Sequence, residues 1–195
     1  ETGYRLIDTA AMYANEEGVG EAIRTASVPR EELFVTTKLW NSDQGYDSAL
    51  KAFDASLERL KLDYIDLYLI HWPAPALGKY VDTWKAFEEI YASGRAKAIG
   101  VCNFNQEHLE KLLSYANVPP MINQVELHPR LQQRELREYC KAQSIQVESW
   151  SPLGGTGGNL LDDPTLTIIA DKHKRSPAQI VIRWHLQQGL VVIPK

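Results

Sequence analysis

The sequence predicts an α/β fold, a (β/α)₈ TIM barrel that is incomplete in this chain. Short β-branched runs alternate with longer helical stretches, no Asn-Gly type of hairpin turn joins two strands, and the apolar runs end on polar or aromatic side chains. Crossovers of this length require parallel strands that are covered by helices. An open doubly wound sheet gathers its ligand groups at one switch point, whereas a barrel collects all its strand ends on one face. Polar groups at nearly every strand end therefore favour the barrel.

The expected strands and helices follow one another along the whole chain. The strands cover Tyr4–Asp8, Leu33–Lys38, Ile65–His71, Ala98–Asn103, Ile122–Glu126, Val147–Trp150 and Leu190–Pro194. Apolar stripes predict helices over Asp47–Leu60 and Gln106–Tyr115. A third helix is expected to be capped by Ser176, opened by Pro177 and closed by Gly189.

Both ends of the sequence resemble the interior of a longer protein. Glu1 is not a methionine, Gly3 leads straight into the first expected strand, and the last apolar run stops at Lys195. We therefore expect residues 1–195 to form one barrel domain with about seven of its eight strands. The first strand and a C-terminal segment are expected to be absent.

Composition is that of an ordinary globular domain and excludes several classes of function. The chain has 21 Lys+Arg against 25 Asp+Glu, a formal net charge of −4, and 44% hydrophobic residues. This mild acidity argues against a nucleic-acid or membrane partner, and no apolar run approaches the roughly 18 residues of a membrane span. Two cysteines, Cys102 and Cys140, favour a reducing compartment. We expect a monomer in the cytoplasm.

Three strand ends carry side chains that are suited to proton transfer. These are Asp8, Lys38 and His71, and Tyr13 follows Asp8 after a short loop. A lysine ammonium beside a tyrosine lowers the phenol pKa, and a carboxylate keeps that lysine charged, so the group would act as a general acid toward a carbonyl oxygen. His71 would orient the same oxygen. Taken singly, each residue also fits an ordinary structural role: an N-cap, a solvated strand end, a core histidine and a loop aromatic.

Other candidate sites are weaker. Glu126 and His128 have no further metal-ligand motif around them, so no metal is expected. The glycine-rich run 154–158 lacks the dinucleotide fingerprint and fits either a surface loop or the approach of a phosphate group. Trp40 and Trp72 lie just past strand ends, where they would wall an apolar pocket.

Seven segments of the chain, in order and without large gaps, resemble one family. They are Gly3–Ala10 with Tyr13, Thr36–Trp40, Asp63–Pro73, Ile99–Phe104, Asn123–Pro129, Ser149–Gly154 and Ile193–Lys195. They are similar to the aldo-keto reductases, in particular to the branch of 2,5-diketo-gluconate reductases and prostaglandin F synthases. The resemblance implies an enzyme that reduces aldehydes or ketones to alcohols with NADPH, a small-molecule carbonyl compound being the partner.

The resemblance also implies the roles of individual residues. Tyr13 would be the proton donor, Lys38 and Asp8 would tune it, and His71 would steer the substrate carbonyl. The remaining matched positions are those that bind NADPH/NADP+ in the family: Cys102, Asn103, Gln124, Trp150, Ser151, Leu153 and Lys195. Of these, Asn103 and Gln124 would hold the nicotinamide carboxamide, Trp150 would stack on its ring and Lys195 would meet the cofactor phosphates.

Three residues depart from the family pattern. Leu6 replaces a common histidine, Cys102 a serine and Trp150 a tyrosine. A thiol is a weaker hydrogen-bond donor than a hydroxyl, so the contact of Cys102 with the carboxamide is expected to be looser. If these residues were the entire molecule, an open barrel edge would make activity doubtful.

Two alternatives to the reductase remain. The first is a regulatory module that binds NADPH on the same fold with little turnover. The second, more distant, is a metal-dependent barrel hydrolase.

Overall fold

The computed structural model describes residues 3–155 and 158–194. The chain divides into two compact units, Glu1–Met121 and Ile122–Lys195. We call them the N-terminal and C-terminal units and describe each by itself. In both, every strand that pairs with another within the unit does so in parallel, as the long crossovers predicted.

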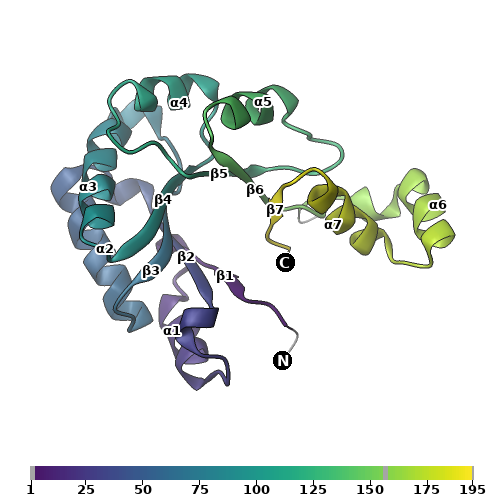
Figure 1. Cartoon of the computed structure of the whole chain (residues 1–195), viewed down its shortest axis with the longest axis horizontal. Helices are drawn as coiled ribbons and strands as arrows, with labels where there is room; N and C mark the ends of the chain where they lie inside the picture. The colour runs from purple at the N-terminus through teal and green to yellow at the C-terminus, as the bar shows by residue number, and fades with distance from the viewer. Residues whose placement is uncertain (1–2, 156–157, 195) are drawn as a thin grey trace. The chain divides into compact units, whose positions relative to one another are not determined.

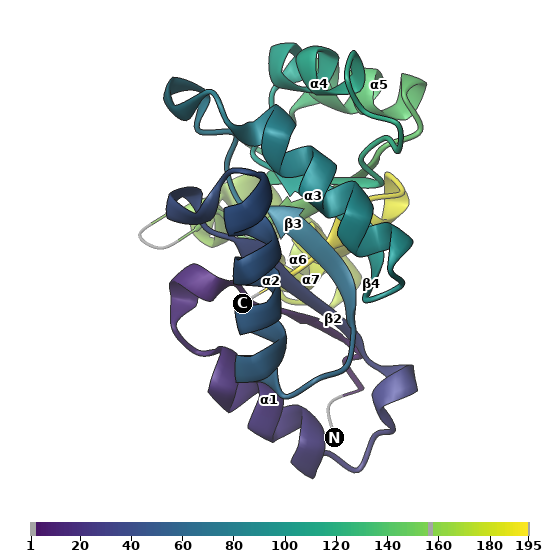
Figure 2. The same ribbon diagram turned by 90° about the vertical axis from the view of Figure 1, so that its left-hand side faces the viewer.

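From residue 3 on, the N-terminal unit alternates four strands with four α-helices. Its elements are β1 (Leu6–Asp8), α1 (Glu16–Thr25), β2 (Phe34–Leu39), α2 (Tyr46–Leu60), β3 (Ile65–Ile70), α3 (Tyr80–Ala92), β4 (Ala96–Cys102) and α4 (Gln106–Leu113), with a 3₁₀ turn at Ala11–Tyr13. Neighbouring helices pack side by side, α1 on α2 and α2 on α3 (Figure 2). The helices lie along the outer side of the strands (Figure 1).

The core of this unit lies between the strands and that helical layer. Leu67, Tyr68, Leu69 and Ile70 on β3 are all fully buried. A strand that is covered on both faces reads as a continuous apolar run rather than an alternating one. Because β3 is covered on both faces, the residue that follows it, His71, is carried by a rigid strand.

The described residues of the C-terminal unit form three strands and three α-helices. They are β5 (Ile122–Glu126), α5 (Arg134–Ala142), β6 (Gln146–Trp150), α6 (Pro164–His173), α7 (Pro177–Gln187) and β7 (Val191–Val192). Helix α7 begins as predicted, since Ser176 and Gln179 form a capping box and Pro177 occupies the first turn. The buried His185 ring on α7 contacts the Leu127 carbonyl oxygen at 3.0 Å, which fastens α7 to the segment after β5.

Three of the expected strands are longer than those observed, and one of them is β3, which ends at Ile70 rather than at His71. β1 starts at Leu6 rather than Tyr4, whose side chain is 66% exposed, and β7 has two residues. Strand bounds depend on a hydrogen-bonding neighbour, which an apolar pattern does not reveal. Cys102 and Cys140 are both buried. Within the described residues no helix is both long and apolar enough to cross a membrane.

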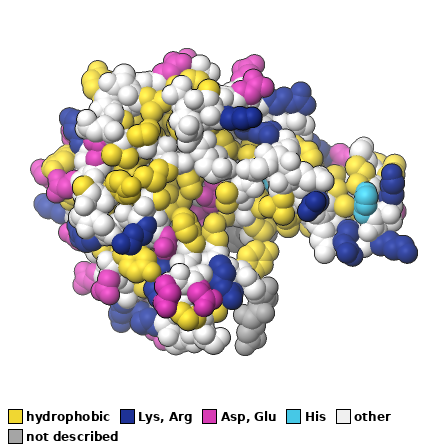
Figure 3. All heavy atoms as spheres, in the orientation of Figure 1, with side chains coloured by type: hydrophobic (Ala, Val, Ile, Leu, Met, Phe, Trp, Pro, Cys, Tyr) yellow, Lys and Arg dark blue, Asp and Glu magenta, His cyan; other side chains and the backbone are white. Residues whose placement is uncertain are grey.

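Helix α6 is the most weakly covered helix of the C-terminal unit. Ile168 is 70% exposed, and Lys172 and His173 lie in the last turn of α6. Basic side chains gather over this helix in Figure 3. The local basic cluster coexists with a net negative charge of the whole chain.

Helix α1 approaches the end of α2 closely at Gly20. A Cβ atom on Gly20 would lie 2.1 Å from the backbone oxygen of Leu60, whereas one on Gly18 of the same helix would meet nothing within 4 Å. Because the obstacle is backbone, the two helices must separate to admit a methyl group. Gly20 is therefore required where these helices meet.

We predict opposite effects of alanine at these two glycines. Gly20→Ala should lower the free energy of unfolding by about 3 kcal/mol, as overpacking does. Gly18→Ala should raise it by up to about 1 kcal/mol, because alanine favours the helix. Urea unfolding of both variants checks this. Equal stability of the two would contradict the close packing.

Candidate active site

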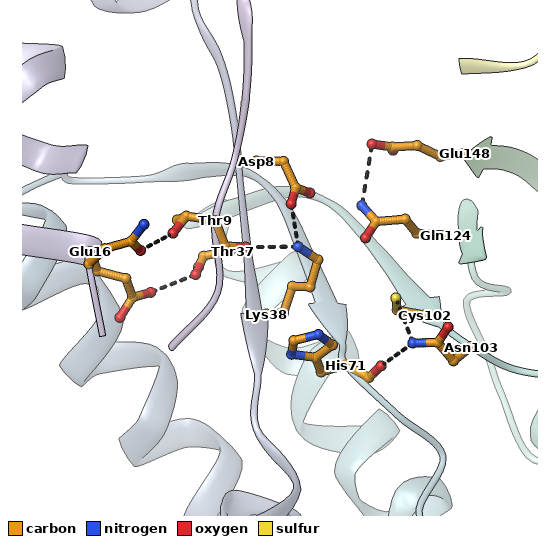
Figure 4. Close-up of polar contacts among 11 residues, drawn as sticks. Asp8, Thr9, Glu16, Thr37, Lys38, His71, Cys102, Asn103, Gln124 and Glu148 are labelled. Carbon is orange, nitrogen blue, oxygen red and sulfur yellow. Dashed lines mark hydrogen bonds and ion pairs between the residues drawn. The ribbon is translucent and has the colours of Figure 1, made fainter. Parts of the chain in front are cut away.

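A buried ion pair joins the ends of β1 and β2. The parallel register sets Asp8 opposite Thr36, so Lys38 follows one pleat beyond. The Lys38 ammonium nitrogen lies 2.5 Å from a carboxylate oxygen of Asp8 and 3.0 Å from the Thr9 carbonyl oxygen (Figure 4). The Lys38 side chain is 1% exposed. These acceptors supply the partners that a buried ammonium requires.

The balance of forces keeps Lys38 charged. Burial disfavours the ammonium, but Asp8 and Tyr13 outweigh it and raise the pKa of Lys38 above its ordinary value. Lys38 is therefore a fixed positive charge at the mouth of these strands.

Tyr13 lies beside that charge on the 3₁₀ turn that follows β1. The Lys38 nitrogen is 5.2 Å from the centre of the Tyr13 ring, which remains 47% exposed. Burial has the largest effect on Tyr13 and raises its pKa. Lys38 lowers this pKa, whereas Asp8 and Cys102 raise it. The net pKa lies above the ordinary value of a tyrosine. The lysine acts in the predicted direction, but the burial outweighs it. The phenol is consequently protonated at neutral pH, and its partly open position leaves it accessible to a substrate.

His71 follows β3 as a neutral imidazole. Burial, and then the charge of Lys38, lower the pKa of His71 to about 4. The ring meets Tyr13 edge-on at 5.7 Å and Trp40 edge-on at 5.2 Å between centroids. Its buried Nδ1 atom has no hydrogen-bond partner among the residues that the structure describes. A neutral ring can donate one hydrogen bond without placing a second cation beside Lys38.

The end of β4 contacts the same region. The Asn103 side-chain amide donates to the His71 carbonyl oxygen at 3.0 Å and to the Cys102 sulfur at 3.2 Å. Asn103 adopts a left-handed conformation, φ 63°, in which asparagine is tolerated better than most residues. Trp40 is half-buried against His71, and Trp72 is 41% exposed. Six of the expected site residues, Asp8, Tyr13, Lys38, His71, Cys102 and Asn103, and the Trp40 ring thus form one connected group.

The C-terminal unit carries further expected residues at its own strand ends. The Gln124 amide on β5 donates to the Glu148 carboxylate on β6 at 3.3 Å, and both side chains are buried. Trp150 ends β6 half-buried. Ser151, φ 47°, begins a turn in which its carbonyl oxygen accepts from the Gly154 amide at 3.0 Å, with Leu153 half-buried inside it.

Some expected positions lie outside the described residues. Lys195 is one, and residues 156–157 of the glycine-rich run are others. The His128 Nε2 atom, in the segment after β5, lies 3.6 Å from a carboxylate oxygen of Glu126, the last residue of that strand. In the described part of the chain, no three His, Cys, Asp or Glu side chains gather as metal ligands would.

Sequence reasoning missed three buried polar residues around these groups. Glu16 and Thr37 are hydrogen-bonded to each other behind β2, and Glu148 holds Gln124. Glu148 could have been found from the sequence, because a charged residue inside a short apolar strand indicates a buried polar group. Nothing in the sequence indicated the Glu16–Thr37 contact, because it joins residues 21 positions apart on different elements.

The arrangement contains groups that are suited to proton transfer to an oxygen atom. A protonated phenol lies between a fixed ammonium and a neutral imidazole, at the ends of neighbouring parallel strands. In barrels of this kind, strand ends carry the catalytic groups. The group is therefore a candidate site for acid catalysis.

Comparison with known proteins assigns the family. The model of the aldo/keto reductase family matches residues 1–195. The chain is 60% identical over 195 residues to the glyoxal reductase of Bacillus subtilis (strain 168), which covers 100% of this chain and 69% of that protein. This protein belongs to the aldo-keto reductase family, as its motifs predicted.

Solved structures agree with that assignment. A crystal structure of an aldo/keto reductase from Brucella melitensis matches with a TM-score of 0.94 and 54% identity, over 99% of this chain and 73% of that one. The Bombyx mori aldo-keto reductase in complex with NADP matches with a TM-score of 0.90 and 43% identity, over 99% and 69%. The predicted fold class, an incomplete (β/α)₈ barrel, is thereby confirmed. The single domain with about seven strands stays a prediction.

We predict that the His71 ring titrates with a midpoint of about 4 in an NMR experiment. Since the unfolded chain takes up this proton near pH 6.5, the stability that His71 contributes is present above that pH and is lost as the pH falls toward 4. Lys38→Met should raise the midpoint by removing one cause, while burial keeps it below 6.5. A midpoint near 6.5 in the unaltered protein would contradict the buried, neutral ring.

Proposed function

We propose that this protein is an NADPH-dependent reductase of aldehydes and ketones, with Tyr13 as the proton donor. The observation that carries the proposal is the protonated Tyr13 phenol next to the Lys38–Asp8 ion pair. When bound, NADPH supplies a hydride to the carbonyl carbon. Tyr13 gives its proton to the carbonyl oxygen, and the charge of Lys38 stabilises the phenolate that remains.

His71 orients the substrate in this proposal. A neutral imidazole donates a hydrogen bond to the carbonyl oxygen and so directs that oxygen toward the Tyr13 hydroxyl. Trp40 and Trp72 contribute the apolar wall that an organic carbonyl compound needs. The partner is thus a small aldehyde or ketone.

The chemistry of the polar groups fits a nicotinamide cofactor. Asn103 and Gln124 carry side-chain amides, which offer both donors and acceptors to a carboxamide. The Trp150 indole provides a flat face for a ring. Cys102, Ser151, Leu153 and Lys195 complete the proposed cofactor positions. A solved relative in complex with NADP supports this reading. A monomeric state and a cytoplasmic location stay predictions from the sequence.

We predict that Tyr13→Phe abolishes carbonyl reduction. Loss of a general acid costs about 100- to 10,000-fold in rate, while the affinity for NADPH should stay within about twofold because the hydroxyl serves only the proton step. Turnover is followed by nicotinamide absorbance with glyoxal and a nitrobenzaldehyde, and binding by nicotinamide fluorescence. Tyr115→Phe, at a side chain that is 65% exposed, is the matched control.

Two results would count against the proposal. A Tyr13→Phe protein that retains about a tenth or more of the rate would remove Tyr13 from the proton step. Tight binding of NADPH by the unaltered protein, with no turnover of any carbonyl compound, would favour the regulatory module instead.

A further inference from the structure

A second ion pair, in which the carboxylate is buried and the arginine is partly exposed, lies behind the strand that carries Lys38. Glu16 opens α1 three residues after Tyr13, and it is 2% exposed. One of its carboxylate oxygens accepts from the Thr37 hydroxyl at 2.5 Å, and the other accepts from the Arg59 guanidinium at 2.7 Å. Figure 4 shows Glu16 and Thr37 approaching each other beside Lys38. A carboxylate is retained in such a buried place only when it is paired.

Glu16 contacts Thr37, the residue that precedes Lys38 on β2. Side chains alternate along a strand, so Thr37 points away from the face to which Lys38 points. The Glu16–Thr37 hydrogen bond therefore fixes β2 from behind, without entering the reacting region. Thr37 is fully buried, so its hydroxyl depends on a hydrogen-bond partner inside the protein, which Glu16 provides.

The segment that carries Tyr13 is held at both of its ends. We call residues 9–16 the Tyr13 turn. At its start the Thr9 carbonyl oxygen accepts from Lys38 at 3.0 Å, and the Thr9 hydroxyl contacts the Asn15 side-chain oxygen at 2.6 Å. At its end Glu16 is bound to Thr37. The position of the phenol relative to the ammonium is set by these two attachments.

The second attachment is itself rigid. Arg59 belongs to the last turn of α2, and α2 meets α1 in backbone contact at Gly20. Glu16 thus binds to β2 and to α2 at once, and the start of α1 has little freedom to shift. A displacement of about 1 Å at a catalytic group costs up to about 100-fold in rate, so such support has a direct chemical consequence.

We infer that Glu16 is a positioning residue: by holding Thr37 and Arg59 together, it keeps the Tyr13 phenol within reach of the Lys38 ammonium. This inference rests on the proposed function, in which Tyr13 is the acid. Glu16 touches neither substrate nor cofactor in it and acts only through the Tyr13 turn and β2.

The test removes the hydroxyl that joins Glu16 to β2. In the full chain, Thr37→Val keeps the shape of the side chain and deletes the hydrogen bond, whereas Thr37→Ser keeps the hydroxyl. Thr25→Val removes a threonine hydroxyl from the far end of α1, where it bonds only to backbone oxygens of its own helix, and serves as the matched control. Glu16→Gln, which preserves size but removes the charge, is measured alongside.

We expect Thr37→Val and Glu16→Gln to lower kcat for glyoxal about tenfold, counted per NADPH-binding site, with the Kd for NADPH within about twofold. Proton transfer should then limit the rate more strongly, so the solvent deuterium isotope effect on kcat should increase. Thr37→Ser and Thr25→Val should keep both values. Counting per binding site removes any loss that comes from unfolded protein.

A purely structural role gives a different result. In that case Thr37→Val would lower the midpoint of thermal unfolding but leave kcat per site and the isotope effect unchanged, and this would overturn the inference. An equal loss in Thr37→Ser would overturn it too. If the unaltered protein and Tyr13→Phe reduce the substrate at the same rate, the proposed function itself has failed. The Tyr13→Phe result thus tests the proposed function, whereas the Thr37 variants test the positioning role.

Discussion

The buried ion pair between Lys38 and Asp8 is the constraint on which the site depends. An ammonium with a 1% exposed side chain is stable only because Asp8 and the Thr9 carbonyl oxygen replace its water. The parallel register of β1 and β2 delivers both partners to the same place. Once fixed there, the charge adds to the effect of burial in keeping His71 neutral, and it opposes the effect of burial on the pKa of Tyr13. The Lys38–Asp8 contact therefore links the strand pairing of the fold to the charge distribution of the candidate site.

The two neighbouring titratable groups respond to that charge in different ways. For His71, the Lys38 charge lowers the pKa further after burial has already lowered it, so the ring stays unprotonated. For Tyr13, burial raises the pKa of the phenol and the Lys38 charge lowers it, but burial has the larger effect. The phenol therefore keeps its proton at neutral pH. A pair of groups whose environments push their pKa values apart is the usual basis for assigning an acid and its helper. In the proposed function, Tyr13 is the acid and His71 is the neutral donor.

Much of this was visible in the sequence, and the reason is geometric. Parallel strands bring their carboxyl ends to one face, so Asp8, Lys38, His71 and Asn103 can be grouped from strand boundaries alone. The direction of the Lys38 effect on Tyr13 could be predicted as well. The net pKa shift of Tyr13 could not, because it depends on burial by residues that are distant in sequence. The Glu16–Arg59 pair escaped for the same reason: 43 positions separate its members, and neither lies in a motif.

The most direct measurement of the central claim is the titration of the Lys38 side chain by NMR in the unaltered protein and in Asp8→Asn. With Asp8 present, the Lys38 ammonium should titrate with a pKa above its ordinary value of about 10.5. Without the carboxylate, burial becomes the dominant influence, and the pKa of Lys38 should fall below that value. An identical titration in both proteins would contradict the account.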